Sequence, residues 1–418
     1  MIRKLELLIV AAILVIAAFS TGLPFLFYLL YLAILVIGGS YVLVRLGLAG
    51  LEAGYVVSQL HGHVGDKMRV TYTLRNGSRL PKLWLEIHNP STLPSGLPGR
   101  AITLAGRSER SWLIRVPLSR RGHFRIEPLH IRTGDPFGFF EASATVGQGV
   151  SVVVYPRLEP LPRWRLPASV LEGSRVAPVR TLQRTPLATT VRPYAPGDSM
   201  NRIHWKSTAR HGEIQVKEFD LEQTADAWIV LDLQRGIQTG QGDESTVEAG
   251  VRAAASIAAR ALQENRAVGM TVNVGRISFL PADRGSRQHL KIMQLLAAVE
   301  ADGSAPLAET LIASVGRLRR GMTAVIITPS LDPAWVRPLA SLRARGVACA
   351  VVTIDAAAFD RYAPDDGSTV AGGATIRGRT DDELVAKHAR SLRHALAEYE
   401  LPTFTITPGR PLGEILAG

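Results

Sequence analysis

The sequence predicts a multidomain protein: a transmembrane helical hairpin at the amino terminus, then a β-sandwich, then an α/β domain. Three observations predict this order. A long uncharged apolar run opens the chain, short strands with Gly and Pro turns follow, and the last half alternates apolar strands with amphipathic helices. The predicted boundaries are 1–50 for the hairpin, 52–156 for the sandwich, 157–225 for a basic connecting segment and 226–418 for the α/β domain.

The hairpin prediction rests on residues 7–44, a run of 38 residues without a charged side chain. A continuous helix of that length would measure about 57 Å, nearly twice the roughly 30 Å hydrocarbon core of a bilayer. A Ser-Thr-Gly-Leu-Pro sequence interrupts the run and marks a turn. We therefore expect two spans, near Leu5–Ser20 and Pro24–Val44.

Basic residues at the two ends of the hairpin predict its orientation. Arg3 and Lys4 precede the first span and Arg45 follows the second, whereas the turn carries no charge. The positive-inside rule then places both outer ends, and everything after about residue 46, in the cytoplasm. We expect a protein of the inner (cytoplasmic) membrane with two spans and cytoplasmic soluble domains. A cleaved signal peptide is the alternative, because a basic pair precedes an apolar core there too.

Two kinds of periodicity follow the hairpin. Short alternating runs such as Met68–Leu74 and Leu83–His88 recur about every 10 residues, which predicts a β-sandwich of immunoglobulin-like type, with a barrel as the alternative. Later, apolar runs such as Trp228–Leu233 and Thr323–Thr328 alternate with helical patterns such as Glu244–Gln263. This alternation predicts a parallel sheet covered by helices on both faces.

The positive charge of the chain is concentrated in its middle. The formal net charge is +12, from 48 Lys and Arg against 36 Asp and Glu, and residues 100–210 alone hold 18 basic and 7 acidic residues. Such a segment faces an anionic partner, a membrane surface or an acidic part of its own chain. Nucleic acid is one alternative, although the Arg residues are scattered through predicted strands without a recognised nucleic-acid module. The one cysteine, Cys349, excludes a disulfide framework and a cysteine-built metal site.

The least ordinary stretch is RPYAPGDSMNRIHWKSTAR, at residues 192–210. We expect Asp198 to cap a short helix that carries a basic stripe at four-residue intervals. A structural latch with a buried Trp205 is one interpretation, and a docking surface for an acidic partner or a phosphate is the other. The candidate residues of this signature are Arg192, Tyr194, Gly197, Asp198, Arg202, Trp205, Lys206 and Arg210.

The pattern R-x-Y-x-x-G-D-x-x-x-R-I-x-W-x-x-x-A-R resembles the signature of the bacterial and archaeal family called domain of unknown function fifty-eight. A second motif supports the resemblance, with Arg120-Arg121-Gly122 followed by Asp135-Pro-Phe-Gly-Phe-Phe140. The resemblance implies a carboxy-terminal domain similar to von Willebrand A domains. It also implies a MoxR-type AAA+ ATPase as protein partner, because genes of the family commonly neighbour such ATPases.

The likeness to von Willebrand A domains implies a Mg²⁺ site built from D-x-S-x-S, a Thr and a second Asp. Here the corresponding loop reads Asp232-Leu-Gln-Arg-Gly236, so Gln and Gly replace both Ser. The oxygen donors that remain as metal candidates are Asp232, Thr328, Ser330 and Asp332. We expect a degenerate site without a bound cofactor, on a domain that presents this edge to partners.

These observations predict a non-enzymatic adaptor or scaffold that is anchored in the membrane and works with a MoxR-type AAA+ ATPase. The sequence contains no phosphate-binding P-loop, no dinucleotide-binding glycine motif and no nucleophile elbow. Two alternatives stay open. One is a Mg²⁺-dependent binding domain of von Willebrand A type, and the other is a nucleic-acid-binding protein that uses the basic segment 100–210.

Overall fold

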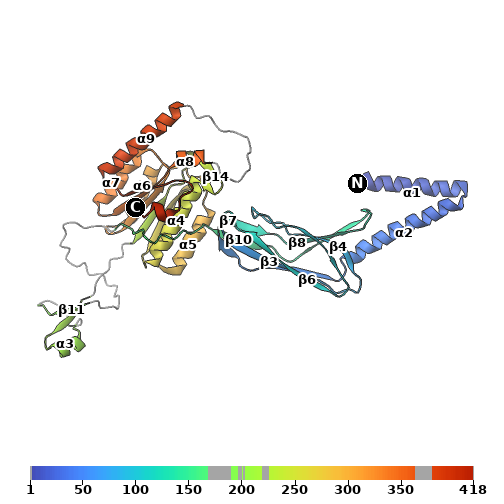
Figure 1. Cartoon of the computed structure of the whole chain (residues 1–418), viewed down its shortest axis with the longest axis horizontal. Coiled ribbons are helices and arrows are strands. Elements are labelled where there is room, and N and C mark those ends of the chain that lie inside the picture. The colour runs from blue at the N-terminus through green and yellow to red at the C-terminus, as the bar shows by residue number, and fades with distance from the viewer. Residues whose placement is uncertain are drawn as a thin grey trace. The chain divides into compact units, whose positions relative to one another are not determined.

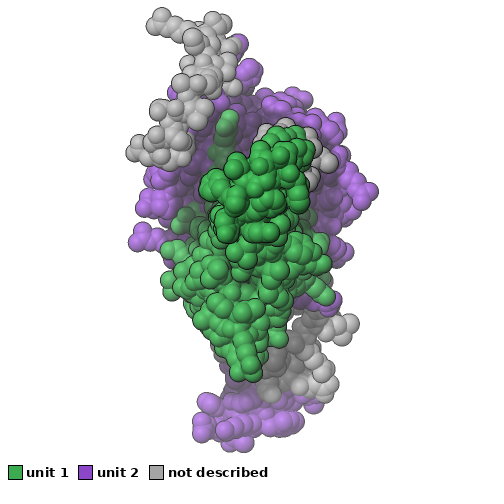
Figure 2. Space-filling view, turned by 90° about the vertical axis from the view of Figure 1, so that its right-hand side faces the viewer, with its two compact units in different colours: residues 1–159, 241–243, 290–300 green, residues 160–240, 244–289, 301–418 purple. Residues whose placement is uncertain are grey.

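The computed structural model describes residues 2–167, 190–195, 200, 203–218, 226–362 and 379–417 (Figure 1). The chain divides into two compact units, coloured separately in Figure 2, and each is described by itself. The first unit comprises residues 1–159, 241–243 and 290–300, and the second comprises 160–240, 244–289 and 301–418. The domain boundaries expected from the sequence stay predictions.

Two apolar helices open the first unit, α1 (Ile2–Thr21) and α2 (Pro24–Gly47). Gly22 ends α1 with φ 65°, a left-handed conformation that glycine adopts without strain, and Pro24 suits the first turn of α2. By length and composition α2 could cross a membrane, whereas the apolar part of α1 is shorter. One amino-terminal helix of spanning length is therefore present, and the second span and the cytoplasmic orientation stay predictions.

Residues 51–155, called the β region below, fold into three small sheets around one core. The sheet orders are β1-β3-β6, β2-β10-β7 and β5-β4-β8-β9. Strand β3 illustrates the pattern: every second side chain points into the core, and the buried ones include Met68, Val70, Tyr72 and Leu74. The strands are β1 (Leu51–Val57), β2 (His61–His63), β3 (Lys67–Asn76), β4 (Lys82–His88), β5 (Arg100–Leu104), β6 (Glu109–Pro117), β7 (Gly122–Ile126), β8 (Leu129–Gly134), β9 (Glu141–Val146) and β10 (Val150–Tyr155).

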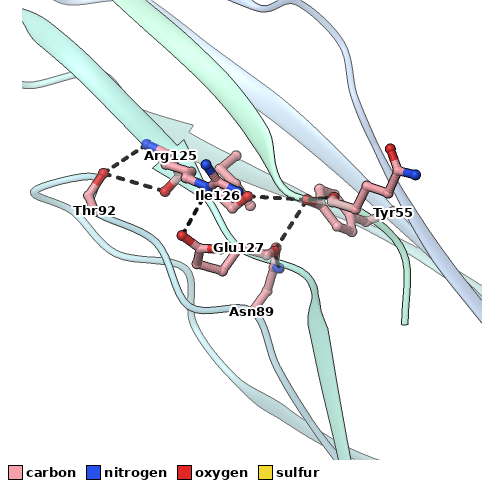
Figure 3. Close-up of polar contacts among 7 residues, drawn as sticks. Tyr55, Asn89, Thr92, Arg125, Ile126 and Glu127 are labelled. Atoms are coloured by element: carbon pink, nitrogen blue, oxygen red, sulfur yellow. Dashed lines mark hydrogen bonds and ion pairs between the residues drawn. The ribbon is translucent and has the colours of Figure 1, made fainter. Parts of the chain in front are cut away.

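A polar network joins β1 to the turns around β7 and β10 (Figure 3). The Tyr55 hydroxyl lies 2.8 Å from the carbonyl oxygen of Gln148 and 3.2 Å from that of Glu127. The Asn89 amide donates to the same Glu127 carbonyl at 2.6 Å. Side chains thus satisfy turn carbonyl groups outside the strand ladders, which fixes the turns to the strands.

The second unit is built around a six-stranded sheet in the order β17-β16-β13-β18-β19-β20. Neighbouring strands are parallel except β17, which pairs antiparallel with β16. Counted along the chain the order is 3-2-1-4-5-6, that of doubly wound α/β folds. The strands are β13 (Ala227–Leu231), β16 (Val268–Val274), β17 (Arg276–Asp283), β18 (Thr323–Thr328), β19 (Ala348–Ile354) and β20 (Thr403–Ile406).

Helices cover both faces of this sheet (Figure 1). Trp228 and Val230 on β13 belong to a core with residues of α6, α7 and α9, while Leu231 packs against Gly250 of α4 on the other face. The parallel sheet expected from uniformly apolar strands is therefore confirmed. The helices are α4 (Thr246–Gln263), α6 (Leu307–Ser314), α7 (Val336–Ala344), α8 (Ala356–Arg361), α9 (Arg379–Glu398) and α10 (Leu412–Ile415). Helix α5 (Gly285–Ala298) begins in this unit, and its residues from 290 onward belong to the first.

Candidate functional site

The signature segment, residues 190–218, folds into a small strand–helix–strand element. Strand β11 (Thr190–Pro193) pairs antiparallel with β12 (Gln215–Glu218), and helix α3 (Trp205–His211) lies between them in the sequence. The element has a minimal core of its own, because Ile203 and Val216 are buried and bridge each other. Arg192 lies in β11, and Tyr194 follows it with a partly exposed ring.

The helix of this segment begins later than the sequence predicts. Its N-cap is His204, whose Nδ1 accepts the Ser207 backbone N–H at 3.3 Å. The expected cap was Asp198, which lies with Gly197 and Arg202 outside the described residues. An imidazole nitrogen takes the role that a carboxylate or hydroxyl oxygen usually has at this position. The basic stripe on the helix itself is therefore reduced to Lys206 and Arg210 (residue numbers four apart).

Trp205 is 70% exposed, which differs from the buried anchor that the latch interpretation requires. Met200 and Ile214 of the same segment are also exposed, and so are Lys206 and Arg210. Large apolar side chains that stay in water beside cations do not serve the core of this segment. Exposed aromatic and basic side chains on one short segment are a combination typical of binding surfaces.

The second candidate site lies at the carboxyl edge of the sheet, where β13 and β18 end side by side. Asp232 follows β13 and is 2% exposed, and its Oδ2 accepts the Thr328 hydroxyl at 2.7 Å. Its Oδ1 accepts the Gln234 backbone N–H at 3.1 Å. Because the strand order reverses between β13 and β18, this is the switch point at which open α/β sheets bind ligands. The structure thus brings Asp232 and Thr328 together.

The other two metal candidates, Ser330 and Asp332, do not contact the Asp232 carboxylate through a hydrogen bond given by the structure. Ser330 donates its backbone N–H to the Thr328 hydroxyl at 2.9 Å. The Asp332 carboxylate caps the short helix that follows, where it accepts the Ala334 N–H at 2.9 Å. Asp332 therefore supports the loop and contributes no oxygen to the Asp232–Thr328 pair in this arrangement.

The loop that contains Gly303 lies beside the loop after β13, at the same edge of the sheet. Gly303 donates its N–H to the Leu233 carbonyl and accepts the Arg235 N–H at 3.0 Å. A Cβ at residue 303 would lie 2.4 Å from the backbone oxygen of Asn273, so only glycine fits here. Sequence reasoning missed this loop, because a lone Gly between two helices gives no signal of a close approach.

Metal binding at this edge of the sheet depends on whether its oxygen atoms are free to act as ligands. Burial raises the pKa of Asp232, opposed by the Thr328 hydroxyl and the Gln234 N–H, which both lower it. Both oxygens of the Asp232 carboxylate already accept hydrogen bonds, from the Thr328 hydroxyl and the Gln234 N–H, whereas Mg²⁺ is usually bound through one or two carboxylates together with water. Among the described residues no group of three or more His, Cys, Asp or Glu side chains gathers in a metal-binding arrangement.

The upstream motif of the β region has structural roles. Arg121 is buried and donates from Nε to the Leu296 carbonyl at 2.9 Å and from Nη2 to the Val299 carbonyl at 2.7 Å. A guanidinium at the carboxyl end of a helix satisfies carbonyl groups that the helix leaves open. Desolvation lowers the pKa of Arg121 to about 10, at which it still carries its charge near neutral pH.

Comparison with known proteins places the chain in a family. Residues 190–399 match the family model described as "Protein of unknown function DUF58", and the chain belongs to this family. A relative is the uncharacterized protein YeaD of Bacillus subtilis, 25% identical over 74% of this chain and 77% of its own length. The uncharacterized protein Rv1480 of Mycobacterium tuberculosis is 31% identical over 42% of this chain and 57% of its own.

Solved structures resemble parts of the chain only weakly. A CARDB domain from Pyrococcus furiosus covers 25% of this chain and 91% of its own, with 10% identity and a TM-score of 0.19. The sporulation control protein Spo0M of Bacillus subtilis covers 25% of this chain and 49% of its own, with 9% identity and a TM-score of 0.15. Scores this low carry no argument about fold or function.

Proposed function

We propose that this protein is a non-enzymatic adaptor anchored in the membrane by its amino-terminal hairpin, with soluble regions that bind protein partners in the cytoplasm. The observation that carries the proposal is the exposed indole of Trp205 on a basic helix. Tryptophan is enriched among the residues that contribute most to binding at protein interfaces, which supports this role for an exposed indole. The nearby Lys206 and Arg210 favour an acidic partner surface.

The proposal includes a finer description of the fold. The β region is assigned as an immunoglobulin-like sandwich, supported by its three antiparallel or mixed sheets around one core. The α/β region is assigned as von Willebrand A-like, supported by its strand order with a single antiparallel edge strand, β17. In this assignment the sheet edge at Asp232 keeps its place in the fold but has lost most of its metal ligands.

The partner we propose is a MoxR-type AAA+ ATPase, as the family resemblance implies. The test is co-purification of that ATPase with the full-length chain from detergent-solubilised membranes. The wild type is compared with a Lys206→Glu, Arg210→Glu variant. The matched control reverses two exposed charges on another helix, Lys387→Glu and Arg390→Glu on α9.

We expect the ATPase with the wild type and the α9 control, and its loss from the α3 variant. Equal recovery with all three proteins would show that α3 is not the docking surface. If no ATPase is recovered with the wild type and nucleic acid co-purifies instead, the adaptor proposal fails. Binding to nucleic acid would then be recognised by its steep loss between about 50 and 200 mM salt.

A second candidate function is Mg²⁺-dependent binding at the sheet edge, favoured by the meeting of Asp232 and Thr328 at the switch point. A cation that binds the folded state raises the melting temperature, because binding is linked to unfolding. The measurement is thermal unfolding of the wild type and of Asp232→Asn with Mg²⁺ or with a chelator. The adaptor proposal expects no Mg²⁺ effect on either protein, whereas a rise confined to the wild type would favour the metal-dependent function.

A further inference from the structure

The β region meets the last two turns of α2. Helix α2 lies against β4, β8 and β9 (Figure 1), and two of its side chains near the carboxyl end, Ser40 and Val44, are buried there. Lys82 of β4 reaches the end of the helix, where its Nζ donates to the Leu46 carbonyl at 2.5 Å and to the Ala49 carbonyl at 2.8 Å. A cation at the carboxyl end of a helix stabilises it.

The position of this contact along α2 sets its depth in a bilayer. At 1.5 Å per residue, Ser40 and Val44 lie about 24 and 30 Å from Pro24 along the helix axis. The hydrocarbon core of a bilayer is about 30 Å thick. If α2 spans a membrane from Pro24 onward, the part of the β region that touches Ser40 and Val44 therefore lies at the boundary between hydrocarbon and headgroups.

A turn after β8 presents aromatic rings at this level. The buried Asp135 carboxylate accepts the Phe137 N–H at 2.9 Å and the Phe140 N–H at 2.6 Å, which fixes the turn. The Phe137 and Phe139 rings stack at 5.6 Å, and the Phe140 ring meets Tyr41 of α2 edge-on at 5.6 Å. Phe137 is 57% exposed although the turn that holds it is well ordered by hydrogen bonds.

The neighbouring strand adds to the exposed apolar surface. Trp84 lies against Gly134 of β8, since a Cβ at residue 134 would come within 2.9 Å of its ring. Exposed Arg45 on α2 and Arg79 before β4 add positive charge. We call the exposed Leu80, Leu83, Trp84 and Phe137, with the half-buried Phe139 that stacks on Phe137, the interfacial patch.

We propose that the interfacial patch binds the lipid bilayer that α2 spans, with its rings at the acyl–headgroup boundary. This inference rests on the membrane anchoring of the proposed function and adds a second, non-spanning lipid contact. Aromatic rings are favoured at that boundary, and basic side chains beside them attract anionic phospholipid. The β region is then held against the membrane surface at a fixed orientation, rather than swinging from the end of α2.

The experiment uses the full-length chain in vesicles of phosphatidylcholine and phosphatidylglycerol, with an NBD fluorophore on an introduced cysteine. Phe137→Cys reports on the patch, and Leu35→Cys reports on the middle of α2. Leu60→Cys is the matched control, because it is an exposed apolar residue beyond β1. The seven residues of β1 carry the chain about 20 Å from α2. The only native cysteine, Cys349, is buried.

We expect nitroxide lipids to quench the probe at residue 137 several-fold more strongly than the probe at residue 60, with a blue-shifted emission. The inference is overturned if the two probes are quenched equally. It is also overturned if residue 137 is shielded from aqueous iodide without lipid quenching, because a protein then covers the patch. If the probe at residue 35 is not quenched, α2 does not span the bilayer, and both the proposed function and the lipid contact are refuted. Quenching at residue 35 without quenching at 137 would leave the anchor standing and refute the patch alone.

Discussion

Two tryptophans in the second unit show opposite uses of the same side chain. Trp335, the residue directly before α7, is 1% exposed and belongs to a core with Leu339 and Val351. Trp205, on the helix of the signature segment, is 70% exposed beside Lys206. The core of the α/β region accounts for the first ring. The core does not account for the second ring, which is free to contact a partner.

The largest expected effect separates these two rings. Trp335→Ala should destabilise the protein by about 3–5 kcal/mol, because it leaves a large cavity in a packed core. Trp205→Ala should change stability by no more than about 0.5 kcal/mol, as surface substitutions do. Urea unfolding followed by circular dichroism measures both. A comparable loss for Trp205→Ala would restore the latch interpretation.

A smaller effect concerns the carboxylate that organises the turn after β8. Asp135→Ala should destabilise the first unit by about 1.5–3 kcal/mol, the usual contribution of hydrogen bonds to a charged group. The exposed Asp243→Ala, in a surface turn, is the control and should be nearly neutral. Thermal unfolding compares the two variants, and equal melting temperatures would contradict the role assigned to Asp135.

The same carboxylate predicts a pH dependence. Burial raises the pKa of Asp135, but the N–H groups of Phe140 and Phe137, with the Ser40 hydroxyl, outweigh it and hold the pKa below its ordinary value. A carboxyl with a lowered pKa stabilises the fold fully above its unfolded pKa of about 3.9 and loses this stabilisation as the pH falls. Wild type and Asp135→Ala should therefore converge in stability at acidic pH, as denaturant unfolding at pH 7 and pH 3 would measure.

Asp232 should behave in the opposite sense. Burial raises its pKa in the folded state, so its proton is held more tightly there, and its contribution to stability is present at low pH and lost as the pH rises through that pKa. Asp232→Asn removes the buried charge and keeps one acceptor oxygen, which can serve the Gln234 N–H, while its NH2 group can donate to the Thr328 hydroxyl oxygen. Its melting temperature at pH 8 should equal or exceed that of the wild type. A clear loss at pH 8 would indicate that the carboxylate binds something essential.

The smallest expected effect is that the Cys349 thiol does not react in the native protein. Burial raises the pKa of the Cys349 thiol to about 12, so little thiolate is present at pH 8. Maleimide should leave the native protein unmodified and modify it in denaturant, which intact-mass measurement resolves. Rapid modification of the native protein would show that the strand carrying Cys349 opens readily.

Much of the fold could be predicted from the sequence, because the apolar residues that become buried recur at regular intervals along each helix and strand. The uniformly apolar β13 and β18 indicate central parallel strands, and the three- and four-residue repeat in α4 indicates an amphipathic helix. Strands β17 and β20 were not predicted. They lie at the two edges of the sheet. Strand β17 mixes exposed and half-buried positions without a clean alternation, and β20 has only 4 residues, too few for its alternation to be distinctive.

The candidate sites were predictable to different degrees. The pairing of Asp232 with Thr328 follows from strands that end at one edge of a sheet, although the sequence does not state which strands are neighbours. The exposure of Trp205 could not be predicted, because tryptophan is highly buried on average and burial is a property of the folded chain. The cap of α3 was missed for a chemical reason, since His204 is not among the usual capping residues.

The central claim is that the signature segment is a docking surface and not a packing element. The most direct measurement titrates the purified full-length chain in detergent with a purified MoxR-type AAA+ ATPase, using wild type and Trp205→Ala, and records the melting temperature of each. We expect Trp205→Ala to weaken binding by about tenfold or more in Kd, equivalent to about 1.4 kcal/mol, at an unchanged melting temperature. An unchanged Kd, or a loss of binding matched by a fall in melting temperature, would contradict it.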